Sequence, residues 1–93
     1  MNAMRLRQRA LMLSNLGQVL QAQGKLSDAV DAYRQELKIA QRLVEQNGAN
    51  ADSQSDLSNS YNSLGDALRD MSNLQDAIDA LRQASAIDQQ LVC

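Results

Sequence analysis

The sequence has no proline, no histidine, no phenylalanine and no tryptophan among its 93 residues. Without proline the backbone lacks its strongest helix breaker, and with only two tyrosines the core must be mainly aliphatic. Alanine and leucine, which favour helices, are frequent. The composition therefore predicts one small all-α domain of modest stability, because a chain this short buries a limited fraction of its surface.

The residues that most enzymes use for chemistry are scarce. There is no histidine, no glycine-rich phosphate loop is present, and the single cysteine, Cys93, is the last residue. We therefore expect no catalysis, no cofactor and no metal. Asp66 and Asp70 lie one helical turn apart, but a divalent cation needs more oxygen ligands, and Arg69 favours a local ion pair. Cys93 is either a free thiol or a cross-link between two chains.

The sequence favours neither a membrane nor a nucleic acid as partner. No apolar run approaches the roughly 20 residues that span a bilayer, and Ala10–Leu13 is too short for a signal peptide. Arginines at positions 5, 7 and 9 favour nucleic acid, but no aromatic residue accompanies them and the net charge is −2. We therefore expect a soluble, cytoplasmic protein.

The charge is distributed unevenly along the chain. Residues 1–46 carry seven basic and four acidic side chains, a net charge of +3, whereas residues 47–93 carry two basic and seven acidic ones, a net charge of −5. This asymmetry has two interpretations. The charges are simply solvated faces, or they orient a neighbouring molecule head to tail through complementary fields.

The segment 13–44 recurs in the segment 61–92 at an offset of 48 positions. Self-similarity at such a period is typical of stacked repeat units. The matching pairs include Leu16-Gly17 with Leu64-Gly65, Leu20 with Leu68, Ala29 with Ala77, Arg34-Gln35 with Arg82-Gln83, and Leu43-Val44 with Leu91-Val92.

Helical periodicity predicts four helices, over residues 1–23, 27–46, 53–71 and 75–92. Ser27 is the expected N-cap of the second helix, and Ser53 with Asp56 resembles a capping box that starts the third. The short connections predict two antiparallel hairpins in a single domain, with repeat one over about 4–46, a linker at 47–52 and repeat two over 53–92.

Two glycines lie in the middle of predicted helices, where glycine costs on the order of 1 kcal/mol relative to alanine. A close approach of another segment should compensate for this cost. We expect Gly17 to pack against the turn around Ala29, and Gly65 to pack against Ala77.

The pattern of these residues resembles the tetratricopeptide repeat. The residues that carry the resemblance are Leu13, Leu16-Gly17, Leu20, Ala29 and Tyr33, followed by Tyr61, Leu64-Gly65, Leu68, Ala77, Leu81 and Ala84. Three features depart from the family pattern: Gln41 and Gln89 replace the closing proline, Glu36 replaces a small residue, and the period exceeds the usual unit of about 34 residues. The longer unit is similar to the extended repeats of kinesin light chains.

The resemblance implies an α-solenoid in which the first helix of each unit lines a concave surface that receives a peptide or a partner helix. Carried over by position, the groove residues are Ser14, Gln18, Gln21, Asn62, Asp66 and Arg69. Their amides can bond to a peptide backbone, although a solvated polar face is the alternative. The lysine and asparagine pairs with which some members grip a terminal carboxylate are not matched at Ser14 and Gln18.

The last helix offers a second candidate surface, because no further unit follows it before Cys93. Its expected uncovered apolar line consists of Ala80, Ala84, Ile87 and Leu91. Arrays normally end in a capping helix with a polar outer face. The sequence therefore predicts a protein-interaction module, or alternatively a self-association segment. The latter is either a homodimer joined through this line or a piece of a longer array.

Overall fold

A computed structural model describes residues 3–47 and 51–92, and these residues form four helices and no strand. The helices are α1 (Ala3–Ala22), α2 (Leu26–Asn47), α3 (Ala51–Asp70) and α4 (Leu74–Val92). The all-α prediction is confirmed, and each observed boundary lies within two residues of the expected one. The linker between the hairpins is shorter than the predicted range 47–52, because Asn47 still belongs to α2 and Ala51 and Asp52 already belong to α3.

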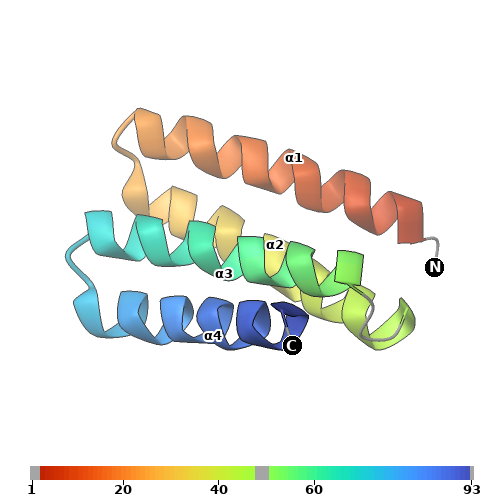
Figure 1. Ribbon diagram of the computed structural model, residues 1–93. Helices are drawn as coiled ribbons and strands as arrows, with labels where there is room; N and C mark the ends of the chain where they lie inside the picture. Colours follow the sequence, from red (N-terminus) through yellow and green to blue (C-terminus); the bar gives the residue numbers. More distant parts are fainter. Residues whose placement is uncertain (1–2, 48–50, 93) are drawn as a thin grey trace.

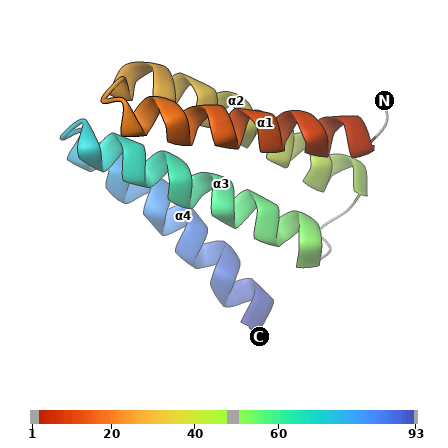
Figure 2. The same cartoon turned by 90° about the horizontal axis from the view of Figure 1, so that it is seen from above.

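The helices form two antiparallel hairpins that stack side by side (Figures 1 and 2). Helix α1 packs along α2, α3 packs along α4, and α2 joins the two hairpins by packing against α3 as well. Helices α1 and α3 touch only sparsely, and in the described part of the chain α1 and α4 make no contact. The slab measures 35 × 29 × 15 Å, with α1 at one edge and α4 at the other.

The core lies where the two hairpins meet. Its buried members are Ala29, Val30 and Tyr33 from α2, Leu64, Ala67 and Leu68 from α3, and Ala77 from α4. Three of these seven residues are alanine, so the helix backbones can approach closely and bury an aliphatic core of limited size. Tyr33 is the one aromatic member, and its ring is almost completely buried.

The two mid-helix glycines mark close approaches, but their partners differ from those predicted. A methyl group on Gly17 would lie 2.6 Å from the Tyr33 ring, and one on Gly65 would lie 2.8 Å from the Leu81 side chain. Ala77 takes part only through its backbone oxygen, 3.5 Å away, and Ala29 is not among the nearest contacts of Gly17. Since Tyr33 and Leu81 are 48 positions apart, both repeats place a large side chain over the glycine at equivalent positions.

Each hairpin turns through the same backbone motif. In the first turn the N–H of Gly24 bonds to the oxygen of Gln21 and the N–H of Lys25 to that of Leu20, a Schellman arrangement. The second turn repeats these bonds at Ser72 and Asn73. The motif requires a positive φ at its second-last residue, and this φ is 81° at Gly24 and 64° at Ser72.

Two expected helix caps are wrong. Helix α2 begins at Leu26, and the N–H of Ala29 bonds to the oxygen of Lys25, so Ser27 lies inside the helix. Ser53 lies inside α3, two residues after its first residue, and is buried. Serine inside a first turn resembles a cap in sequence because only backbone geometry distinguishes the two positions.

Candidate functional site

A groove runs between α1 and α3, with α2 as its floor, and side-chain contacts join α1 to α3 at both of its ends. At one end the Arg7 guanidinium lies 3.5 Å from the Asp56 carboxylate; at the other the Gln21 amide donates a 2.7 Å hydrogen bond to Asp70. Each pair joins residues 49 positions apart. Helices α1 and α3 therefore run side by side in the same direction, as Figure 1 shows.

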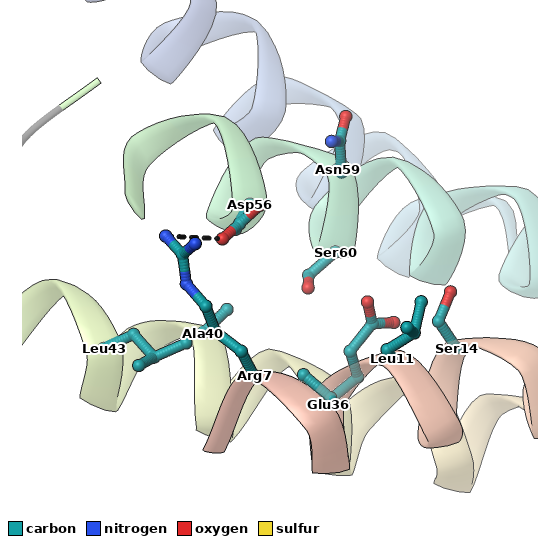
Figure 3. A pocket seen from close by; sticks show the side chains of 10 residues that line it. Arg7, Leu11, Ser14, Glu36, Ala40, Leu43, Asp56, Asn59 and Ser60 are labelled. Atoms are coloured by element: carbon teal, nitrogen blue, oxygen red, sulfur yellow. Dashed lines mark ion pairs between the residues drawn. The ribbon is translucent and has the colours of Figure 1, made fainter. Parts of the chain in front are cut away.

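At the end of the groove where Arg7 pairs with Asp56 lies a pocket of about 300 Å³ (Figure 3). Its walls come from three helices: Arg7, Ala10, Leu11 and Ser14 from α1, Glu36, Ala40 and Leu43 from α2, and Asp56, Asn59 and Ser60 from α3. Four of the ten lining residues are alanine or serine, and larger side chains at these positions would fill the space between the helices. The lining combines apolar carbon with a few polar groups, which is typical of binding pockets.

Glu36 is the principal polar group on the floor of this pocket. Its carboxylate extends from α2 toward Ser60 of α3, with which it forms a hydrogen bond (Figure 3). The atom Oε1 is buried and finds no hydrogen-bond partner among the described residues. Burial raises the pKa of the Glu36 carboxyl and the negative charge of Asp56 raises it further, whereas the bond from Ser60 opposes the shift. The equivalent residue in repeat two is Ala84, so only repeat one has this carboxylate.

A chain of hydrogen bonds closes the other end of the groove. The Tyr33 hydroxyl donates to Oε1 of Gln21 over 3.0 Å, and Nε2 of the same amide donates to Asp70. Burial raises the pKa of Tyr33, and the charges of Glu36 and Asp66 raise it further, so the hydroxyl stays protonated and able to donate. One glutamine thus links α2, α1 and α3.

A match to a protein-family model over almost the whole chain shows which family the chain belongs to. The model of the tetratricopeptide repeat matches residues 8–90, which include both hairpins and all the groove residues except Arg7. The chain belongs to the tetratricopeptide repeat family. Repeats of this family generally mediate protein–protein interactions and are not catalytic. No curated protein and no solved structure matches the chain.

The tetratricopeptide groove contains some of the predicted site residues and not others. Ser14 lines the pocket, whereas Gln18 is exposed and does not. Gln21 is half-buried and holds the closed end, so its amide is already engaged. On α3, Asn62 is exposed, and Asp66 and Arg69 form an exposed ion pair at 3.5 Å.

The pocket also contains residues that the sequence analysis did not select: Arg7, Asp56, Asn59 and Ser60. Glu36 left a signal in the sequence, because a charged residue stands where the repeat pattern has a small one. Arg7, Asp56, Asn59 and Ser60 gave no such signal, because the sequence does not show which residues of a polar helix face lie opposite another helix. Among the described residues, no group of three or more metal-ligating side chains gathers, and no helix is long and apolar enough to span a bilayer.

The expected exposed line on α4 is wrong. Ala80, Ala84 and Ile87 are buried within the single chain, because α3 of the same tetratricopeptide hairpin covers them. The structure does not describe the side chain of Leu91. The exposed apolar residues of α4 are instead Leu74 and Ile78, which lie on a different face of the helix.

Proposed function

We propose that this chain is a non-catalytic interaction module that binds a peptide or a partner helix in the groove between α1 and α3. The observation that carries the proposal is the pocket of about 300 Å³ in the part of that groove next to Arg7 and Asp56. A side chain of the partner enters this pocket, while the exposed amides of Gln18 and Asn62 are available to the partner's backbone.

The charges of the groove indicate the chemistry of the partner. Three carboxylates line the pocket or close the far end of the groove, those of Glu36, Asp56 and Asp70, against the single guanidinium group of Arg7. This excess of negative charge favours a lysine or arginine side chain. Its aliphatic stem lies along Ala40 and Leu43 and its charged end approaches the carboxylate of Glu36 on the pocket floor.

A display library of random peptides tests this function. The chain selects binders, which are then retested against a variant in which Glu36 is glutamine and Gln18 and Asn62 are alanine. A control variant changes two amides and one carboxylate on exposed positions of α2, namely Gln35, Glu45 and Gln46. The proposal expects peptides rich in lysine or arginine that bind the control but bind the groove variant at least about tenfold more weakly. Peptides that bind both variants equally well contradict it.

Self-association without a foreign ligand is the second candidate function. It is favoured by exposed apolar side chains on α1, namely Met12, Leu16 and Val19, which one chain leaves in contact with water. Sedimentation velocity over a range of concentrations tests it, because an associating chain sediments faster as its concentration rises. A homodimer is the simplest product, and a chain that stays monomeric throughout contradicts this candidate.

A further inference from the structure

Helix α1 exposes an apolar stripe whose counterpart in the second repeat is buried. Met12, Leu16 and Val19 follow one another at helical spacing and are 70%, 50% and 54% exposed. The residues 48 positions later are Ser60, Leu64 and Ala67 of α3, which are at most 7% exposed. The same face of the same helix is therefore covered in repeat two and bare in repeat one.

The structure shows what covers this face in repeat two. Val30 of α2 belongs to the same buried cluster as Leu64 and Ala67, and α2 packs along α3. The counterpart of Val30 in repeat two is Ile78 of α4, which is 44% exposed. The counterpart of Leu26 is Leu74, which is 60% exposed although Leu26 is half-buried.

Both halves of one interface are thus present but unpaired. We propose that α4 of one copy docks on α1 of a second copy and repeats the packing of α2 on α3. Ile78 of one copy then meets Leu16 and Val19 of the next, as Val30 meets Leu64 and Ala67 within the chain. The inference rests on self-association, the second candidate function above, and specifies its surface.

The arrangement and the charges of the chain support a second copy as the occupant. Helices α1 and α4 lie at opposite edges of the slab, so one chain does not bring them together (Figure 1). Head-to-tail docking places repeat two, with a net charge of −5 over residues 47–93, beside repeat one, with +3 over residues 1–46. Complementary fields of this kind favour the head-to-tail orientation over docking of two like ends.

The proposed interface has two different halves and therefore does not close on itself. Each docked copy still presents one free α1 face and one free α4 face, so association continues beyond two chains as concentration rises. This behaviour distinguishes the proposal from a two-fold dimer, in which identical surfaces meet and association stops at two.

The decisive experiment uses two variants, Leu16→Asp and Ile78→Asp, followed by sedimentation velocity. Both side chains are about half exposed in the single chain, so an aspartate should leave the fold intact, which circular dichroism checks. Each variant alone should associate at least about tenfold more weakly, because docking would bury an unpaired charge. Ala86→Asp is the control, because its residue is exposed and its counterpart Lys38 is exposed as well.

An equimolar mixture of the two variants is the critical sample. The Leu16→Asp copy keeps an intact α4 face and the Ile78→Asp copy keeps an intact α1 face, so the mixture should form a one-to-one complex that grows no further. If wild type associates but the mixture stays monomeric, or if the Ile78→Asp variant associates as wild type does, the docking is overturned while self-association stands. A wild-type chain that is monomeric at every concentration overturns both.

Discussion

The ring of Tyr33 lies so close to Gly17 that a methyl group on this glycine would come within 2.6 Å of the ring. Tyr33 is 2% exposed, and its hydroxyl is bonded to Gln21, so the ring is held from both ends. In repeat two the counterpart of the ring is the half-buried side chain of Leu81, which carries no such bond. The two repeats share one close approach but differ in how rigidly it is held.

This difference predicts effects of different size for the same substitution. Gly17→Ala should lower the free energy of unfolding by about 1–3 kcal/mol, because overpacking against a fixed ring outweighs the better helix propensity. Gly65→Ala should change it by less than about 1 kcal/mol, because the leucine can rotate and alanine favours the helix. Urea denaturation of the two variants measures both values.

The double variant Gly17→Ala with Tyr33→Leu is the control for this reasoning. It copies the leucine of repeat two into repeat one, so the added methyl group should cost less there than beside the ring. If Gly17→Ala costs the same with tyrosine and with leucine at position 33, contact with the ring is not the cause.

The two hairpin turns provide a matched pair for backbone strain. Ser72 has a φ of 64°, whereas its counterpart in the first turn, Gly24, has a φ of 81° and open space around it. Ser72→Gly should stabilise the fold by about 0.5–1 kcal/mol, because only glycine adopts this conformation without steric cost. Gly24→Ala should destabilise it by a similar amount.

Thermal unfolding measures both turn variants. A change of 1 kcal/mol shifts the midpoint by roughly 4–8 °C in a domain of this size, so the two shifts should be resolved and opposite in sign. A Ser72→Gly variant that melts below wild type would show that the serine makes a favourable interaction worth more than the strain.

The hairpins could be predicted from the sequence because they follow from local signals. The recurrence at 48 positions, the turns around positions 24 and 72 and the mid-helix glycines agree with one another, and the observed helices lie within two residues of expectation. The faces of the helices were harder to predict. On helix α4, the apolar line of Ala80, Ala84 and Ile87 was expected to be uncovered but is buried under α3.

The site shows the same limit. Ser14, which was expected in the groove, lines the pocket, but the closed end at Gln21 and the ion pair between Arg7 and Asp56 depend on how far apart α1 and α3 lie. That distance is set by α2, which packs against both helices. Contacts between helices that are distant in sequence therefore decide which polar residues meet, and no local pattern records them.

Glu36 predicts a dependence of stability on pH. Its pKa is raised above the ordinary value of 4.5, chiefly by burial, so the folded chain holds this proton more tightly than the unfolded chain does. The resulting contribution to stability is present below pH 4.5 and is lost as the pH rises through the folded-state pKa. Glu36→Gln mimics the protonated form, so it should stabilise the chain near pH 7 by at most about 1 kcal/mol, since the group is only partly buried.

Thermal midpoints between pH 4 and 8 test this sign. The difference in midpoint between Glu36→Gln and wild type should grow as the pH rises above 4.5. Glu45→Gln, at an exposed position of the same helix, is the control and should follow wild type throughout. If the difference shrinks with rising pH, the carboxylate is favoured in its charged form and the assignment is wrong.

Ser58 predicts how firmly the last helix is attached. Its hydroxyl is buried and can donate either to Asp88 at 2.7 Å or to the Ala84 oxygen at 3.3 Å, both in α4. Ser58→Ala removes both alternatives and should cost about 1–2 kcal/mol, whereas Asp88→Ala should cost less, because the hydroxyl can then turn to the backbone oxygen. Urea denaturation measures both, and hydrogen exchange of the α4 amides shows whether the loss is local. Equal costs for the two variants would mean that the bond to Ala84 does not replace the bond to Asp88.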